Sequence, residues 1–218
     1  MSRGNWMQTY SGGLYWPSDP RPEDVRIEDI AHHLAMLCRY TGAVRRFYSI
    51  AEHSVLVSLM VPPQHALSGL LHDATEAYLN DINRPVKRSP GMEGYRVIEA
   101  RNWRVIAKAF GLPVIHPAEV EKADAEALFH EQAALMPSEP PGLDFGMGLP
   151  RPAVVRPDLI KGWSWEEAKD VFLTRYQEIT VATPLPGLMS CPKCFRLGFG
   201  SMFGPNCTDC ENRERGFY

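Results

Sequence analysis

The chain has 218 residues, of which 44% are apolar and 22% charged, so it can bury one principal core and carry a small extra module. Its formal net charge of -3 gives no reason to expect non-specific binding to nucleic acid, which normally requires a clustered basic surface. The first ten residues contain no basic segment followed by an apolar run, and no stretch approaches the roughly 18 apolar residues of a membrane span. We therefore expect a cytoplasmic protein without membrane contact.

The chain begins with an irregular segment, since residues 11–24 are rich in Gly, Pro and acidic turn formers. Apolar residues at three- and four-residue spacing, with Gly or Pro at the ends, then predict five helices. These cover about residues 27–42, 49–61, 63–80, 91–110 and 117–135. Ser49 and Glu52 form a capping-box pattern at the start of the second helix. No convincing strand pattern appears in this region, so the core is predicted to be all-α.

Residues 136–157 are rich in Pro and Gly and predict an extended loop, either a lid or a strap. Ser164 and Glu167 form a second capping box, and the apolar stripe after it predicts a last helix that packs back on the core. The predicted domain organisation is a core of residues 1–180, a linker of 181–190 and a small module of 191–218.

The motif HDATE at residues 72–76 is the most informative part of the sequence, because a helix would place Glu76 one turn after His72 and Asp73. Two other predicted helices carry an ionisable residue, His53 and Asp124, where the periodicity requires an apolar one. Burying a charge without a partner is costly. One divalent cation held by His53, His72, Asp73 and Asp124 would satisfy all of them, and imidazole with carboxylate suits zinc, manganese, cobalt or iron better than magnesium. The alternative is that each is a satisfied core residue or a helix-end group.

This arrangement of His53, then His72-Asp73, then Asp124 in a helical frame resembles the H…HD…D signature of the HD-domain phosphohydrolases, over roughly residues 7–180. The segments AEHSVLVS, LLHDATEAYLNDINRPVK and EKADAEAL are similar to the small nucleotide-cleaving branch of that superfamily. This branch includes bacterial 5′-deoxynucleotidases and phage dATP triphosphohydrolases. The opening MQTYSGG at Met7 also resembles the start of phage and prophage members. The resemblance implies a helical bundle of the HD-domain type.

The resemblance also implies roles for residues near the motif. Glu76 and Asp81 would handle the attacking water, and a carboxylate near a cation is chemically suited to position the water and take its proton. Asp81 follows Asn80, so a turn residue is an equal alternative for it. Lys87 resembles a phosphate-contacting lysine. Weaker phosphate-binding candidates, each of which could equally be a solvated surface charge, are Arg39, Arg46 and Lys122.

Four cysteines near the end predict a second, structural metal site. They form two Cys-x-x-Cys pairs separated by twelve residues: Cys191, Cys194, Cys207 and Cys210. This is the spacing of a zinc ribbon or knuckle, in which four thiolates close a tetrahedral zinc site that supplies the folding energy of a short segment. The alternative is four free thiols. The segment is nearly charge-balanced, which favours a protein contact or a subunit interface over nucleic acid.

The primary functional prediction is a metal-dependent nucleotide phosphohydrolase, which the resemblance narrows towards a deoxynucleoside triphosphate triphosphohydrolase acting on dATP. It would use one catalytic divalent cation, with additional magnesium as an option, and it would be a homo-oligomer in a bacterial host cell if phage-encoded. An aromatic pocket for the base would draw on Trp16, Tyr40 or Phe47. The alternatives are a 5′-deoxynucleotidase on monophosphates, a cyclic-nucleotide phosphodiesterase and a non-catalytic nucleotide sensor or adaptor.

Overall fold

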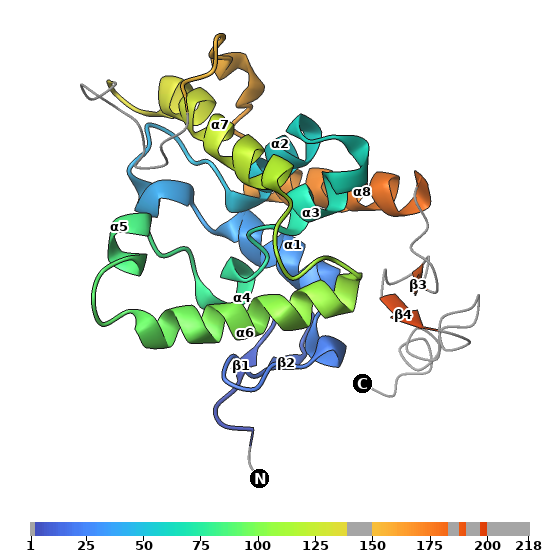
Figure 1. Ribbon diagram of the computed structural model, residues 1–218. Helices are drawn as coiled ribbons and strands as arrows, with labels where there is room; N and C mark the ends of the chain where they lie inside the picture. Colours follow the sequence, from blue (N-terminus) through green and yellow to red (C-terminus); the bar gives the residue numbers. More distant parts are fainter. Residues whose placement is uncertain (1–2, 139–149, 183–187, 191–196, 200–218) are drawn as a thin grey trace.

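A computed structural model of the chain describes residues 3–138, 150–182, 188–190 and 197–199. It is mostly helical, as the sequence predicts (Figure 1). Its helices are α1 Ile27–Met36, α2 Ile50–Met60, α3 Ala66–Leu71, α4 Glu76–Leu79, α5 Arg84–Lys87, α6 Glu93–Phe110, α7 Ala118–Leu135 and α8 Trp165–Ala182. Two small antiparallel hairpins pair β1 Met7–Gln8 with β2 Leu14–Tyr15, and β3 Leu188–Ser190 with β4 Leu197–Phe199. Strand β2 lies inside residues 11–24, which the sequence predicts to be irregular, so the first hairpin was not expected.

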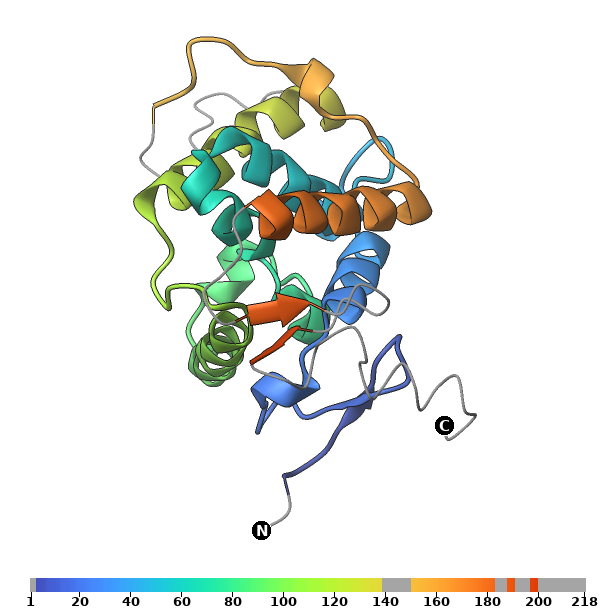
Figure 2. The same ribbon diagram turned by 90° about the vertical axis from the view of Figure 1, so that its right-hand side faces the viewer.

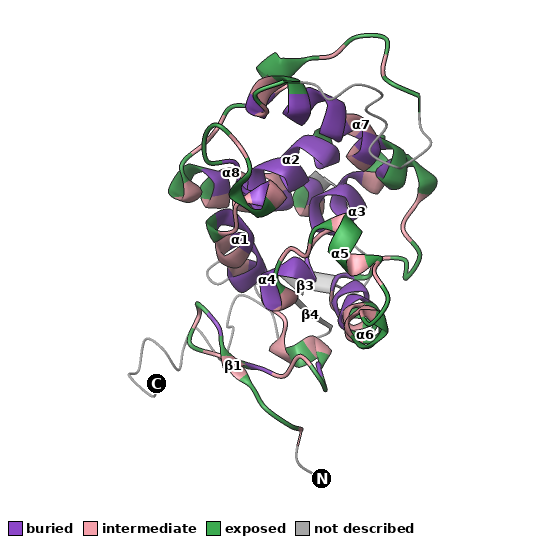
Figure 3. Ribbon diagram, turned by 90° about the vertical axis from the view of Figure 1, so that its left-hand side faces the viewer, coloured by how far each residue is buried: buried purple, intermediate pink, exposed green. Residues whose placement is uncertain are grey.

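Helix α2 lies at the centre of the bundle and packs against α1, α3, α7 and α8. Every residue from Ile50 to Ser58 is buried, and Figure 3 shows this helix and α3 almost wholly in the colour of buried residues. A helix that is covered on all sides does not need one apolar stripe. The last helix, α8, packs on α1, α2 and α3, which confirms the prediction that it returns to the core.

The first predicted helix is shorter than expected, because α1 ends at Met36 and the prediction of 27–42 is wrong beyond it. Cys38 instead forms an isolated bridge with Ser49, and the backbone N–H of Arg39 donates to the carbonyl oxygen of Tyr48 at 2.9 Å. The residues after it turn sharply, with Tyr40 at a φ of 58° in the left-handed region. Pairing with the segment before α2 therefore replaces the last turn of the predicted helix and places Arg39 beside Tyr48.

The predicted helix 63–80 is also wrong as a continuous element. A 3-10 turn over Pro63–His65 leads into α3, residues 72–75 form turns, and α4 restarts at Glu76. A further short helix, α5, was not expected; the side chain of Asn83 caps it by accepting from the N–H of Val86 at 3.2 Å. By contrast, α6 and α7 lie within about two residues of the predicted ranges 91–110 and 117–135, within the usual uncertainty of helix ends.

The two capping boxes differ in the structure. Ser49 accepts from the N–H of Glu52 at 3.1 Å, but the carboxylate of Glu52 turns away to another partner. At α8 the pattern is reciprocal, since Ser164 Oγ accepts from the N–H of Glu167 and the Glu167 carboxylate accepts from the N–H of Ser164. The second box is thus confirmed in full and the first only at its cap.

The buried carboxylate of Glu52 anchors the segment before α8. It accepts from three successive backbone N–H groups, those of Lys161, Gly162 and Trp163, at 2.7, 2.9 and 2.9 Å. The segment contains the 3-10 turn Pro157–Leu159, which packs on α7. Figure 2 shows this segment crossing the top of the molecule in that view. The segment between the predicted loop and α8 is therefore a strap, held to α2 by the Glu52 carboxylate.

Residues 139–149 of the predicted loop and the four cysteines of the predicted zinc ribbon lie outside the described residues. None of the described helices combines the length and the apolar content that a membrane span needs.

Candidate active site

Two histidine side chains from neighbouring elements face each other at the centre of the bundle. His53 projects from the middle of α2 and is fully buried, while His72 follows the last residue of α3. Their Nε2 atoms are 3.2 Å apart. Asp73 Oδ2 lies 3.3 Å from Nε2 of His72 and 3.6 Å from Nε2 of His53. The ligating atoms of these three side chains all lie within 4.8 Å of one another, a spacing that could hold a metal ion.

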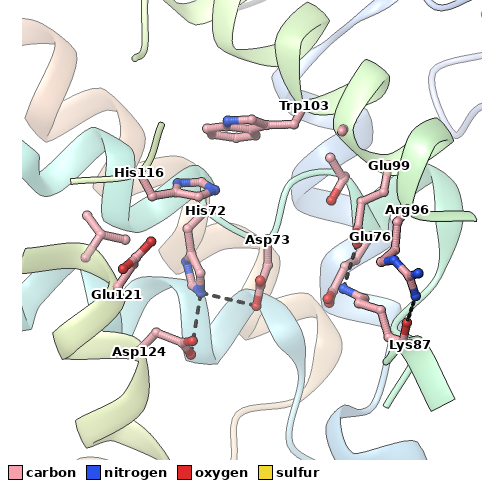
Figure 4. Close-up of a pocket in the computed structure, with 13 residues that line it drawn as sticks. His72, Asp73, Glu76, Lys87, Arg96, Glu99, Trp103, His116, Glu121 and Asp124 are labelled. Atoms are coloured by element: carbon pink, nitrogen blue, oxygen red, sulfur yellow. Dashed lines mark hydrogen bonds and ion pairs between the residues drawn. The ribbon is translucent and has the colours of Figure 1, made fainter. Parts of the chain in front are cut away.

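The fourth predicted ligand comes from α7. Asp124 Oδ1 lies 3.1 Å from Nε2 of His53 and 3.8 Å from Nε2 of His72. Figure 4 shows Asp124 and Asp73 on two sides of the His72 ring, each joined to it by a dashed line. The structure thus places Asp124 against both histidines, beside the group of His53, His72 and Asp73.

The orientation of both rings is fixed by the nitrogen that faces away from this point. His72 Nδ1 lies 2.8 Å from the carbonyl oxygen of Gly69, and His53 Nδ1 lies 2.6 Å from Oε1 of Glu131. Because a carbonyl and a carboxylate accept hydrogen bonds, each Nδ1 is the donor, and a neutral ring then presents an Nε2 lone pair to the centre. Two lone pairs and two carboxylates therefore face this point, and Arg39 NH1 donates to Asp73 Oδ2 at 3.2 Å from one side of it.

Such a group of acceptors needs either a cation or extra protons. Burial opposes charging of His72, but Asp73 and Asp124 outweigh it and raise its pKa well above the ordinary value. Burial likewise opposes ionisation of Asp124, but its hydrogen bonds to His53 and His72 hold its pKa well below the usual range. A divalent cation would supply the same positive charge, so the residues present fit a metal centre with mixed nitrogen and oxygen ligands.

Glu76, the predicted general base, opens α4 beside this centre. It is 7% exposed, and its Oε2 is buried with no hydrogen-bond partner among the described residues. Burial, followed by the charges of Asp73 and Asp81, raises its pKa well above the usual value for a glutamate. Asp81 lies in the loop after α4, where burial also raises its pKa. Glu76 is therefore a poorly solvated carboxyl group adjacent to the ligands.

Two cavities meet at the centre and share Asp73, Glu76, Lys87 and Asp124 in their walls. The first, about 330 Å³, is lined mainly by α6, α7 and the segment between them, whose other side chains there are Arg96, Glu99, Ala100, Trp103, His116, Val120 and Glu121. The second, about 480 Å³, is lined on the side of the loop after α1 and of α5 by Arg39, Tyr40, Asp81, Ile82, Asn83, Arg84, Pro85 and Leu128. Asp81 is therefore placed in the wall of the second cavity.

The predicted phosphate-binding residues separate into two groups. Lys87 lines both cavities, where its Nζ pairs with Glu99 at 2.6 Å (Figure 4), and Arg39 lines the second, where it pairs with Asp73 at 3.2 Å. Arg46 instead donates to the carbonyl oxygen of Ile160 at 3.1 Å. Lys122 is exposed on α7, and neither it nor Arg46 is among the residues that line these two cavities.

Only one of the three aromatic residues predicted for a base pocket lines either cavity. The ring of Tyr40 is in the wall of the second cavity. Trp16 stacks with the guanidinium of Arg3, 3.9 Å from its ring centroid, and Phe47 is 39% exposed. An aromatic wall that the sequence did not indicate is formed by Trp103 and His116, whose ring centroids are 4.3 Å apart.

The comparisons with known proteins place this chain in a family. The chain is 37% identical over 146 residues to YfdR, an uncharacterized protein of Escherichia coli K12, and the match covers 67% of this chain and 78% of that protein. The chain belongs to the YfdR family. It is also 38% identical over 127 residues to an uncharacterized protein of Rhodobacter capsulatus, covering 54% of this chain and 64% of that protein. No model of a known protein family matches the chain.

Sequence reasoning missed one buried carboxylate at the centre of this YfdR-family protein. Glu131 on α7 is fully buried and contacts Nδ1 of His53. Burial alone would raise its pKa, but Arg39 and His53 lower it to about 2. Its spacing was a usable signal, because Glu131 follows Asp124 by two helical turns and lies on the same face of α7.

Proposed function

We propose that this YfdR-family protein is a metal-dependent nucleotide phosphohydrolase built on a helical core of the HD-domain type. His53, His72, Asp73 and Asp124 would hold one divalent cation. The observation that carries the proposal is the convergence of two Nε2 atoms and two carboxylates in which both rings use their N–H to bond outward. Two imidazole lone pairs with two carboxylates are suited to a cation such as zinc, manganese, cobalt or iron.

A cation bound there would lower the pKa of a water molecule and polarise a phosphoryl oxygen. Glu76 would position that water and accept its proton, for which its buried, unpartnered Oε2 and its raised pKa are suited. Asp81, in the wall of the second cavity, would help to orient the water. Lys87 and Arg39 would hold the phosphate groups, and Lys87 would exchange its contact with Glu99 for a substrate oxygen.

The proposed substrate is a deoxynucleoside triphosphate, with dATP favoured by the resemblance of the sequence to the small nucleotide-cleaving branch. The size of the two adjoining cavities, about 330 and 480 Å³, falls within the range of small-molecule sites. Their mixture of cationic and aromatic side chains also suits a nucleotide. The structural zinc on Cys191, Cys194, Cys207 and Cys210 stays a prediction, as do a homo-oligomeric state and a protein contact through that module.

The direct test is product analysis with purified protein and several divalent ions. We expect tripolyphosphate from dATP in the presence of manganese or cobalt. Orthophosphate from dAMP would instead indicate a 5′-deoxynucleotidase, and opening of a cyclic phosphate a phosphodiesterase. Tight nucleotide binding without turnover of any nucleotide would contradict the hydrolase and favour a sensor.

Glu76→Gln tests the assignment of the base. It should lower turnover by about 10²- to 10⁴-fold while manganese still binds, because the substitution removes the proton acceptor but leaves the ligands in place. Asp73→Asn should lose both turnover and metal. The matched control is Glu119→Gln on α7, whose side chain is 52% exposed and which should retain activity. Near-normal turnover by Glu76→Gln would show that another group accepts the proton.

A further inference from the structure

One buried carboxylate faces away from the proposed metal position but is hydrogen-bonded to one of the proposed metal ligands. Glu131 is fully buried on α7, and its Oε1 lies 2.6 Å from Nδ1 of His53. It lies on the opposite side of the imidazole from the centre where Nε2 meets His72 and Asp124. Glu131 therefore contacts the ring at the one atom that cannot also reach the cation.

We infer that Glu131 is the positioning residue of the metal centre, which holds His53 in the tautomer and orientation that direct its Nε2 lone pair at the cation. The inference deepens the proposed function and rests on its metal site. A carboxylate can only accept from Nδ1, so Nδ1 carries the proton and Nε2 is left free to ligate. A ring with the opposite tautomer would present an N–H to the cation.

The surroundings of Glu131 favour this role over simple core packing. Oε1 also accepts from the hydroxyl of Tyr48 at 2.9 Å, Oε2 accepts from the hydroxyl of Tyr40, and Nε of Arg39 lies 3.4 Å from Oε2. A buried carboxylate is costly unless several donors satisfy it. Here the donors come from the loop after α1, from the residue before the cap of α2, and from α2 itself, so both oxygens are held in place.

Arg39 connects this carboxylate with the metal centre from the other side. Its NH1 lies 3.2 Å from Oδ2 of Asp73, while its Nε faces Glu131. One guanidinium thereby bridges the positioning carboxylate and a proposed ligand. Two of the four proposed ligands, His53 and Asp73, are consequently oriented by one connected group of buried side chains.

The test is manganese affinity, measured by electron paramagnetic resonance on the full-length, metal-stripped protein. Manganese is the probe because thiolates bind it weakly, so the C-terminal cysteines do not compete. Glu131→Ala should weaken binding by about 10- to 100-fold, the usual effect of removing a partner of a ligating histidine. Glu131→Gln should restore most of the affinity, because its amide oxygen can still accept from Nδ1.

The matched control is Tyr48→Phe, which removes a different donor from the same oxygen and is equally buried. It should leave manganese affinity within about threefold of wild type, since the bond to His53 stays. If Glu131 served packing alone, the alanine variant and Tyr48→Phe would both lower the melting temperature and leave manganese affinity unchanged. A folded Glu131→Ala protein with wild-type affinity would overturn the inference.

A second measurement needs no variant. In the zinc-loaded wild-type protein, long-range proton–nitrogen correlations should show His53 protonated at Nδ1 and bound to metal through Nε2. Protonation at Nε2 would overturn the inference even if Glu131→Ala failed to fold. The two proposals fail differently: a wild-type protein that binds no manganese contradicts the metal site itself, whereas binding that is indifferent to Glu131 contradicts only its positioning role.

Discussion

At the scale of single residues, the proposed centre contains a buried carboxyl group that lowers the stability of the fold. Glu76 is buried with an oxygen that has no partner among the described residues, and its neighbours Asp73 and Asp81 carry the same charge. A structural residue would be paired or replaced. An unpaired carboxyl beside a potential cation site is the kind of group that function keeps at a cost in stability.

Metal-free Glu76→Gln protein should be more stable than wild type only at high pH. The pKa of Glu76 in the fold lies above that of the unfolded chain, so as pH rises the unfolded chain loses its proton first and ionisation destabilises the fold. The neutral amide removes that penalty. We expect a gain on the order of 1 kcal/mol at about pH 8 and none at about pH 4, measured by urea unfolding. An equal gain at both values would rule out the charge as its cause.

The sequence predicted the four proposed ligands because each breaks a local rule. His53 and Asp124 occupy apolar positions of helices, and His72-Asp73 stands beside a glutamate in a short motif. Glu131 follows Asp124 by two helical turns on the same face of α7, but this spacing alone does not show that the carboxylate is buried. Its burial depends on three donors that are distant in sequence, which local patterns do not reveal.

At the scale of elements, the sequence predicted helix existence better than helix continuity. Helices α6 and α7 follow long periodic segments and were predicted closely, whereas the helix expected over 63–80 breaks at the turns of residues 72–75. One local and one tertiary contact accompany this break: the carbonyl oxygen of Gly69 in α3 accepts from His72 Nδ1, and Asp73 pairs with Arg39. This turn lies between α3 and Glu76, the proposed general base, and carries the proposed ligands His72 and Asp73.

The strap before α8 should depend strongly on Glu52. Glu52→Ala removes the acceptor of three backbone N–H groups and should lower the free energy of unfolding by ~2–4 kcal/mol. Ser164→Ala, which removes only the cap of α8, should lower it by about 1 kcal/mol and provides the comparison. Urea denaturation measures both. A smaller loss for Glu52→Ala than for Ser164→Ala would show that the carboxylate does not fasten the strap.

At the scale of the whole molecule, the all-α character of the core followed from periodicity, but the position of each helix did not. Helix α2 is central because its neighbours cover every side of it, and its buried serines and histidine give no such signal in sequence. The proposed centre forms where α2, the end of α3 and α7 meet. Each of these elements contributes at least one side chain that packing alone does not explain.

The most direct test of the central claim is anomalous diffraction from crystals of the manganese-loaded protein, collected at the manganese edge. The account predicts one strong peak within coordination distance of His53 Nε2, His72 Nε2 and carboxylate oxygens of Asp73 and Asp124, at about 2.0–2.2 Å from each. An active, manganese-loaded protein whose anomalous peaks all lie away from these four side chains would contradict it.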